Sequence, residues 1–255
     1  MKALILAAGY GTRLYPLTIN LPKPLLLVSR RPMINFLLDK LVAIKGLKEI
    51  YVVTNDKFSS NFEKWRKHLE PDFRKLRIKV LNDGTKSPED RRGAIGDIQF
   101  AISKEDIRTD LLVLGGDNLF TFGIEDFICF ARKHSPRTSI GLFDIHHKEE
   151  AVKFGVVKLD QQCRISSFLE KPGHPKSTLI AMCLYYFPKE SLGRIGKYLH
   201  SGKRKDASGS YISWLYKQEP VFGYVFYGEW FDIGHIDSYS KAKKAFTRYI
   251  KEVKA

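Results

Sequence analysis

Short apolar runs alternate with amphipathic stretches along the first 145 residues. The apolar run at 2–9 ends in glycine and predicts a strand, whereas the apolar side chains within 31–47 share one face of a helix. The alternation continues to residue 145, with strands expected at 49–55, 78–83, 110–120 and 138–145, and helices at 59–70, 91–105 and 124–135. This order of elements predicts an α/β fold with a doubly wound, mostly parallel sheet.

The pattern changes after residue 145. Residues 154–172 predict two strands around a polar turn and 179–188 a further apolar run, so a β-rich part is expected to follow. The charged stretch 200–210 predicts a mobile loop, with a substrate lid as one alternative. No linker rich in glycine, serine or proline interrupts the chain. We therefore expect a single domain over 1–255, divided into parts at 1–145 and 146–236 and a C-terminal helix at 237–255.

Composition narrows the class of protein. The 255 residues can bury a sizeable core, and 44% of them are hydrophobic. Cys129, Cys163 and Cys183 are odd in number and widely spaced, which predicts a reducing compartment and small, buried hydrophobic side chains. No apolar run reaches the ~20 residues of a membrane span. We expect a cytoplasmic protein with no membrane partner.

The formal net charge of +15 favours anionic partners, whether phosphorylated metabolites, nucleic acid or acidic lipid. Part of this charge lies in the tail 241–255, which predicts a helix with one apolar and one lysine-rich face. No recognised RNA- or DNA-binding motif accompanies the charge. The net charge alone does not identify the partner, and without such a motif we expect no nucleic acid.

The glycines that follow the first predicted strand pose the question of what this turn holds. A Walker loop needs a glycine-lysine pair here, and none is present; a dinucleotide fingerprint needs a third glycine where Leu14 stands. The strand at 49–55 also lacks the acidic residue that binds a ribose in dinucleotide sites.

A phosphate site remains open for this turn, and so does a purely structural corner. Small residues end the strand, and backbone N–H groups at Gly11, Thr12 and Arg13 could converge on an anion. Arg13 can grip phosphate oxygens with two nitrogens. Lys23 lies between two prolines, which restrict its backbone.

Residues 6–25, LAAGYGTRLYPLTINLPKPL, reproduce the whole opening motif of the sugar nucleotidyltransferases with its spacing. The chain resembles this family along nearly its full length, since further family segments follow in order: LVLGGDNLF, FGVVKLD, SFLEKPGHPKS and GEWFDIGHIDSY. Within the family it is most similar to glucose-1-phosphate thymidylyltransferases and their uridylyl and cytidylyl relatives.

The resemblance implies a reaction between a nucleoside triphosphate, with dTTP or UTP favoured, and a sugar 1-phosphate related to glucose 1-phosphate. The products would be a nucleoside-diphosphate sugar and pyrophosphate, with Mg²⁺ as cofactor. The sugar phosphate is already an anion, so the chemistry needs cations and alignment rather than a general base. A catalytically silent regulatory subunit of the same fold is the alternative. Family members form oligomers, which makes a homo-oligomer one expected state.

The resemblance also implies roles for four charged residues. Asp117 and Asp232 would hold Mg²⁺, since carboxylates are ligands that this ion prefers. Arg13 would bind the β- and γ-phosphates and Lys23 the α-phosphate, which makes Arg13, Lys23 and Asp117 the catalytic set. Taken singly, the alternatives are a turn aspartate for Asp117 and surface cations for Arg13 and Lys23.

Two further groups of residues take binding roles by the same resemblance. The nucleotide-binding residues would be Ala8, Gly9, Gly11, Thr12, Arg13 and Gly93. The sugar-phosphate-binding residues would be Gly155, Glu170, Lys171 and Tyr185. Without the resemblance, Gly155 reads as a β-bulge, Glu170 and Lys171 as a salt pair at a hairpin end, and Tyr185 as a core residue.

The sequence departs from the thymidylyltransferase pattern in two places. The glutamine that faces the base in those proteins is missing, and Asn82 or Asp83 is the expected substitute. Met182 and Cys183 stand where the family has Asn or Thr followed by Gly, two residues before Tyr185. We expect a reshaped sugar site.

Overall fold

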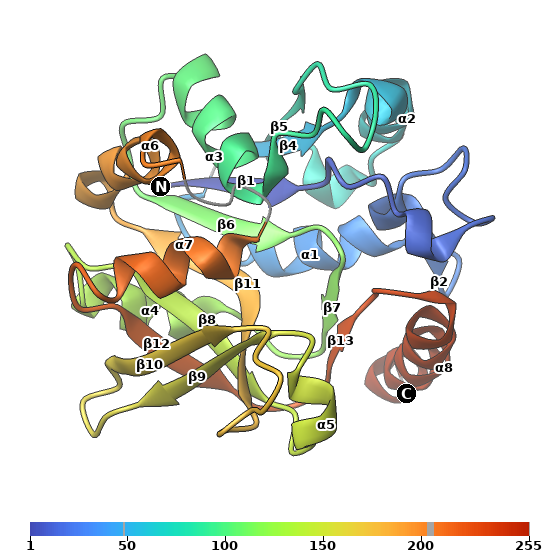
Figure 1. The fold of residues 1–255 in the computed structure, drawn as a ribbon. Helices are drawn as coiled ribbons and strands as arrows, with labels where there is room; N and C mark the ends of the chain where they lie inside the picture. Colours follow the sequence, from blue (N-terminus) through green and yellow to red (C-terminus); the bar gives the residue numbers. More distant parts are fainter. Residues whose placement is uncertain (48, 203–206, 255) are drawn as a thin grey trace. The chain divides into compact units, whose positions relative to one another are not determined.

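The computed structural model describes residues 1–47, 49–202 and 207–254, and of 251–254 the backbone only (Figure 1). The described chain forms two compact units. The first unit comprises residues 1–4, 92–114 and 125–227, and the second 5–91, 115–124 and 228–255. The division into parts that the sequence suggested stays a prediction.

The second unit contains a parallel pair of strands, β4 (Glu49–Thr54) and β5 (Arg77–Asn82), together with the end of β1 (Lys2–Leu6). Its other elements are η1 (Thr12–Leu14), η2 (Lys23–Leu25), β2 (Leu27–Val28), β3 (Arg31–Pro32), α1 (Met33–Val42), α2 (Asp56–Lys67), η3 (Pro71–Phe73), β7 (Asn118–Phe120), β13 (Trp230–Asp232) and α8 (Ile236–Lys254). The carboxyl ends of three strands meet here, because Ala7 N donates to Val53 O at 2.8 Å and Gly116 N to Leu6 O at 2.9 Å. This edge is the usual ligand side of a parallel sheet.

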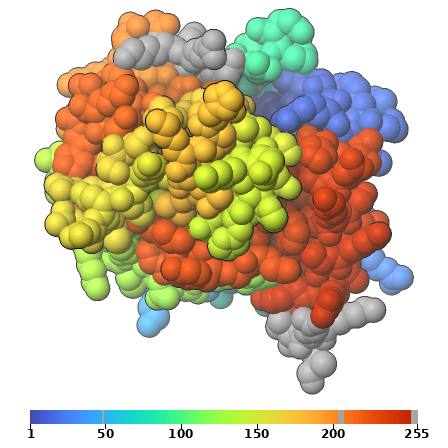
Figure 2. Space-filling view, turned by 60° about the horizontal axis from the view of Figure 1, so that its bottom comes forward, coloured from blue at the N-terminus to red at the C-terminus, as the bar shows by residue number. Residues whose placement is uncertain are grey.

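In the first unit the strand order is β10-β9-β11-β6, with β8 beside β11 and β12 beside β8. Its elements are α3 (Gly93–Lys104), β6 (Leu111–Gly115, the last residue in the second unit), α4 (Glu125–Lys133), β8 (Ser139–Asp144), α5 (Lys148–Ala151), β9 (Gly155–Leu159), β10 (Ile165–Glu170), β11 (Leu179–Phe187), η4 (Lys189–Ser191), α6 (Gly193–His200), α7 (Ser208–Leu215) and β12 (Phe222–Phe226). The β9–β10 hairpin lies on the surface, yellow in Figure 2. The predicted α/β fold with a mostly parallel sheet and a β-rich part is confirmed.

The prediction of a single strand at 110–120 is wrong. It is two strands, β6 and β7, separated by Gly116 and Asp117, and β7 pairs with β13 in a separate two-stranded sheet. The apolar run is continuous in sequence, but the chain turns at Gly116, where a Cβ would lie 2.8 Å from Leu6 O. The turn leaves Asp117 at the carboxyl edge.

The four-residue helix α5 in the β-rich part was not predicted, and neither were two longer helices, α6 and α7. Both of these are eight residues long and contain two glycines or a glycine flanked by serines, residues of low helix propensity that hide the helical pattern. Of the loop expected at 200–210, residues 203–206 lie outside the described residues, and Ser208–Ser210 belong to α7.

The cysteines do not lie in the core as expected. Cys129 and Cys163 are exposed and Cys183 is half-buried. Cys163 occupies the polar turn between β9 and β10, where a small side chain is tolerated in the left-handed region at φ +60°.

The predicted C-terminal helix is confirmed as α8, red in Figure 1. Ala242 and Phe246 are buried, and Tyr239, Tyr249 and Ile250 pack against the same hydrophobic cluster of the second unit. Among the described residues, no helix has the length and apolar character needed to cross a membrane.

Phe246→Ala should lower the free energy of unfolding by about 3–5 kcal/mol, because it leaves a cavity in this cluster. Phe246 is 1% exposed and its ring meets those of Phe36 and Tyr249 at centroid distances of 5.3 and 5.6 Å. Urea unfolding measures the loss. The control is Lys244→Ala on the exposed face of the same helix, expected to stay within about 0.5 kcal/mol of wild type; equal losses in both variants would contradict the packing of α8.

Candidate active site

The glycine turn of the second unit has a specific backbone shape. Gly11 takes φ +65°, and a Cβ there would lie 3.2 Å from the side chain of Thr18, which is buried. Thr18 Oγ1 donates to Gly11 O at 2.7 Å. Conformation and space both favour glycine here, and the turn leads directly into η1, whose first N–H groups lack intrahelical partners.

Asn55 ties this turn to the neighbouring strand. Its Nδ2 donates to Ala8 O at 2.9 Å, and its Oδ1 caps α2 by accepting from Phe58 N at 3.1 Å. Because Asn55 is fully buried, both bonds are shielded from water. The carbonyl of Ala8 is thereby held, while Gly9 remains exposed.

An ion pair joins two of the predicted catalytic residues. Lys23 Nζ donates to Asp117 Oδ2 at 2.6 Å, and the two side chains are 13% and 33% exposed. Lys23 begins η2, and the ring of Pro24 would lie 3.1 Å from a Cβ on Gly116. The absence of a side chain at Gly116 thus allows η2 to approach the turn that carries Asp117.

Asp232 lies at the end of the β7–β13 pair that is next to Asp117. It is paired in register with Asn118, and Ile233 N donates to Asp117 O at 3.2 Å. A Cβ on Gly234 would lie 3.3 Å from Asp232 Oδ2 and 3.8 Å from Arg13 Nη1. The structure therefore brings Arg13, Lys23, Asp117 and Asp232 together, although they are far apart in sequence.

The electrostatics of Asp117 follow from these neighbours. Burial alone would raise its pKa, but the charge and hydrogen bond of Lys23, with the charge of Arg13, outweigh burial and hold the pKa of Asp117 below its usual range. The carboxylate is ionised at neutral pH, as a metal ligand must be.

The donor chemistry at this end of β7 and β13 fits Mg²⁺, since Asp117 and Asp232 offer oxygen ligands of the kind that this ion takes alongside phosphate and water. Among the described residues, no three histidine, cysteine or acidic side chains form a ready metal-binding group. Two carboxylates match a site that a nucleotide's phosphates would complete.

The residues expected to bind the sugar phosphate lie in the first unit. Gly155 pairs in register with Glu170 across β9 and β10. A Cβ on Gly155 would clash with Phe168 Cζ and would lie 3.1 Å from Glu170 Oε2, so a larger residue would crowd both side chains. Burial raises the pKa of Glu170, and the nearby Lys171 charge only partly opposes the shift. Lys171 itself is exposed.

Tyr185 is 2% exposed, and its hydroxyl lies 2.8 Å from Ser208 Oγ on α7. The next residue, Gly209, is close to Glu170: a Cβ on Gly209 would lie 2.8 Å from the Glu170 carboxyl carbon. The first turn of α7 therefore joins Glu170 and Tyr185 in one group.

The positions suggested for base recognition are engaged in local structure. Asn82 Oδ1 accepts from Gly84 N at 2.8 Å, and its Nδ2 donates to Asp56 at 2.7 Å. Asp83 is 2% exposed and accepts from the amide and hydroxyl of Thr85, both at 2.7 Å. In the first unit, Gly93 opens α3 with φ +75°.

Sequence reasoning missed the residues that support this site. Asn55 carries a sequence signal as a cap before a helix, and Thr18 and Gly116 lie inside the family segments LAAGYGTRLYPLTINLPKPL and LVLGGDNLF. The others act through tertiary contacts with no local pattern; the missed residues are Thr18, Asn55, Gly116, Ser208 and Gly209.

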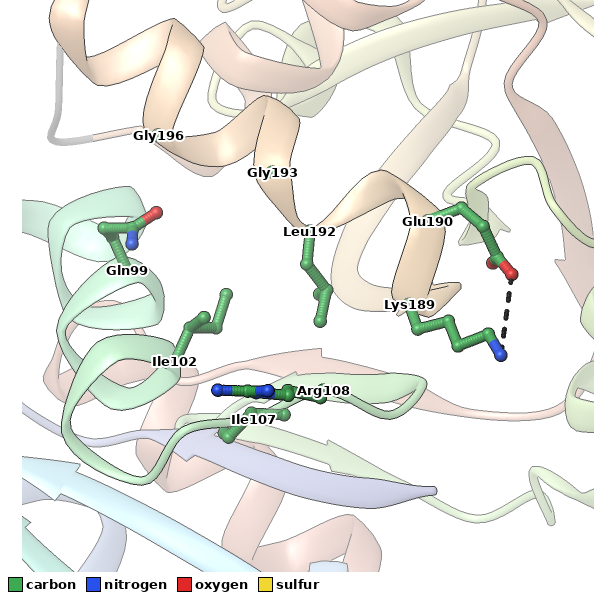
Figure 3. Close-up of a pocket in the computed structure, with 9 residues that line it drawn as sticks. All are labelled: Gln99, Ile102, Ile107, Arg108, Lys189, Glu190, Leu192, Gly193 and Gly196. Carbon is green, nitrogen blue, oxygen red and sulfur yellow. Dashed lines mark ion pairs between the residues drawn. The ribbon is translucent and has the colours of Figure 1, made fainter.

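A pocket of about 470 Å³ in the first unit lies among α3, η4 and α6 (Figure 3). Its charged side chains have acidic or basic partners, Arg108 with Asp106 at 2.8 Å and Lys189 with Glu190 at 4.0 Å. None of the predicted site residues lines this pocket.

Comparison with known proteins places these features in context. The profile of the family described as Nucleotidyl transferase matches residues 2–248. The chain is 30% identical to a glucose-1-phosphate thymidylyltransferase of Neisseria meningitidis over 95% of its own length and 81% of the relative's. It is 29% identical to a mannose-1-phosphate guanyltransferase of Gibberella zeae, with coverage of 92% and 61%. The chain spans 51% to 61% of the length of four curated relatives that it matches.

A solved structure of UDP-glucose pyrophosphorylase with UDP-glucose has the same fold. The TM-score is 0.79 at 19% sequence identity, with 97% of this chain and 98% of that chain covered. Identity at this level supports the fold alone.

Lys23→Met should lower the free energy of unfolding at pH 7 by about 1–3 kcal/mol, because it leaves the Asp117 carboxylate without its partner. The pKa of Asp117 is depressed in the folded state, so the pair's contribution is present above the unfolded pKa of about 3.9 and is lost as pH falls through the folded value. Urea unfolding at several pH values should show the gap from wild type narrowing on acidification. Lys189→Met, from a surface pair, is the control and should cost at most about 1 kcal/mol. A gap that does not change with pH would contradict the ion pair.

Gly155→Ala should destabilise the protein by about 1–3 kcal/mol through overpacking against Phe168 and Glu170. Gly173→Ala is a matched control, because a Cβ on Gly173 meets nothing within 4 Å. Thermal and urea unfolding compare the two variants, and equal stability would show that Gly155 is not crowded.

Proposed function

Because this chain belongs to the nucleotidyl transferase family, we propose that it joins a nucleoside triphosphate to a sugar 1-phosphate and releases pyrophosphate. The observation that carries the proposal is the ion pair of Lys23 and Asp117 at 2.6 Å, with Arg13 and Asp232 close to one another at the same edge. Two cations and two carboxylates suit phosphoryl chemistry, in which repulsion between anions must be overcome.

In this reaction an oxygen of the sugar 1-phosphate attacks the α-phosphorus in line. A new P–O bond forms as the bond to the β-phosphate breaks, and the electron pair leaves with pyrophosphate. Arg13 holds the β- and γ-phosphates and stabilises the leaving group, while Lys23 turns to the α-phosphate. The backbone at Ala8, Gly9, Gly11 and Thr12 lies along the nucleotide.

Asp117 and Asp232 are the residues that hold Mg²⁺ in this proposal. Held by these carboxylates, Mg²⁺ would supply positive charge beside the α-phosphate and would act there as a Lewis acid. The depressed pKa of Asp117 supports this role, since its carboxylate needs no deprotonation at neutral pH.

In this proposal, residues of the first unit bind the sugar 1-phosphate. Lys171 binds the phosphate, Glu170 accepts hydrogen bonds from sugar hydroxyls, and Gly155 and Tyr185 line the sugar. We favour glucose 1-phosphate or a close relative as substrate, and dTTP or UTP as nucleotide, with Gly93 against the base. GTP is tested with them, because a relative of similar identity is a guanyltransferase.

Pyrophosphate release from the purified protein tests the proposal. dTTP, UTP, GTP and CTP are each combined with glucose, mannose and N-acetylglucosamine 1-phosphates, with Mg²⁺ or with chelator. We expect one pair to react only with metal, and Asp117→Asn to lower kcat/KM by at least about 10³, equivalent to about 4 kcal/mol. Asp106→Asn, an exposed surface aspartate, is the control and should keep full activity.

Other outcomes assign the protein differently. Nucleotide binding without pyrophosphate release would identify a regulatory subunit of this fold. No nucleotide binding would overturn the proposed function.

A further inference from the structure

Cys183 has a backbone conformation that residues with a side chain rarely adopt. Its φ is +55°, in the left-handed region. It lies in a bulge of β11, where residues 182–184 stand opposite Gly141 alone on β8. The neighbours Met182 and Leu184 are buried, whereas Cys183 is half-buried, so the bulge turns the cysteine out of the core. Backbone outliers of this kind mark candidate functional positions.

The cysteine belongs to a group of four side chains, which we call the thiol cluster: Cys183, Tyr185, Ser208 and Glu170. Ser208 Oγ lies 3.8 Å from Cys183 Sγ and 2.8 Å from the Tyr185 hydroxyl. The Glu170 carboxylate lies against Gly209, the residue that follows Ser208. Strand β11, the end of β10 and the first turn of α7 thus bring a thiol, two hydroxyls and a carboxylate together.

The side chains of the thiol cluster differ in the strength of the hydrogen bonds that they form. Glu170 and the hydroxyls can accept or donate strong hydrogen bonds, as a polyhydroxylated ligand requires. The thiol forms only weak ones and behaves as a small hydrophobic group. A sugar hydroxyl that faced the thiol would lose water without gaining an equivalent partner.

We propose, resting on the proposed function, that Cys183 selects the sugar. Its thiol contacts the bound sugar ring and favours sugar 1-phosphates with a small, apolar substituent at that point. An acylamino group there is disfavoured through crowding, whereas a hydroxyl, as in glucose 1-phosphate, fits without gaining an equivalent polar partner.

A thiol footprint tests the contact. In a Cys129→Ser/Cys163→Ser background, Cys183 is the one thiol left, and its alkylation by N-ethylmaleimide is followed by mass spectrometry. Saturating glucose 1-phosphate, or whichever tested sugar phosphate binds, should slow alkylation about tenfold or more. A chain that retains Cys163 alone, exposed in the β9–β10 turn, is the control, and its rate should not change.

Substitution tests the selection. Cys183→Gly should fold at least as stably as wild type, because glycine takes φ +55° without strain. It should shift the ratio of kcat/KM for N-acetylglucosamine 1-phosphate over glucose 1-phosphate by about tenfold or more towards the larger sugar. Cys183→Ser keeps the size of the side chain and should give a smaller shift towards hydroxylated substituents.

The outcomes separate this inference from the proposed function. Turnover without protection of Cys183, and with unchanged ratios in Cys183→Gly, overturns the inference and leaves the function standing. Protection of Cys183 without turnover supports the thiol–sugar contact and overturns the reaction. Neither turnover nor protection overturns both.

Discussion

The pairing of Lys23 with Asp117 is the interaction around which the second unit's site is arranged. A half-buried carboxylate and a nearly buried ammonium each lose hydration, so neither is stable there without the other. The local structure serves this contact: η2 begins at Lys23, Gly116 leaves room for Pro24, and β7 begins immediately after Asp117. In the proposed reaction, Lys23 would exchange the carboxylate of Asp117 for a phosphate, which is also an anion. Asp117 would exchange the ammonium of Lys23 for a metal cation. The Lys23–Asp117 pair thus satisfies both charges at one edge of the sheet.

Close approach of the backbone is the second constraint, and it recurs in both units. At Gly116 the limit is a strand carbonyl, and at Gly155 and Gly209 it is the side chains of Phe168 and Glu170. None of these three positions requires glycine for its φ. The requirement is space, which only the tertiary structure reveals, whereas Gly11 is limited by both φ and its contact with Thr18.

The sequence predicted much of the fold because α/β alternation is a local pattern. Strands such as β4 are short continuous apolar runs and helices such as α8 have strong periodicity, and the structure contains both. The break between β6 and β7 was not predicted, because an apolar run does not show where a chain passes from one sheet to another. Helices α6 and α7 escaped because their glycines and serines weaken the helical signal.

The charged residues of the site were accessible to sequence reasoning because most lie in contiguous motifs. Arg13 and Lys23 belong to one segment, and Asp117 lies in another, within the strand predicted at 110–120. Ser208 was not accessible, since its partners Tyr185 and Cys183 lie more than 20 residues away in a different element. The left-handed backbone of Cys183 is likewise a property of the bulge in β11 rather than of its neighbours in sequence.

Two carboxylates, Asp117 in the second unit and Glu170 in the first, show how different surroundings give one chemical group two different pKa shifts. Asp117 faces Lys23 and Arg13, so its pKa is lowered and its charge is stable across the neutral range. Glu170 is half-buried with Lys171 as its opposing charge; the effect of burial prevails, so the pKa of Glu170 is raised. By linkage, Asp117 stabilises the fold above its unfolded pKa, whereas ionised Glu170 costs stability as pH rises through its folded value. A carboxylate with a lowered pKa, such as Asp117, stays ionised and can serve as a ligand of a cation. One with a raised pKa, such as Glu170, gains most when hydroxyl donors solvate it, which is the environment that a bound sugar supplies.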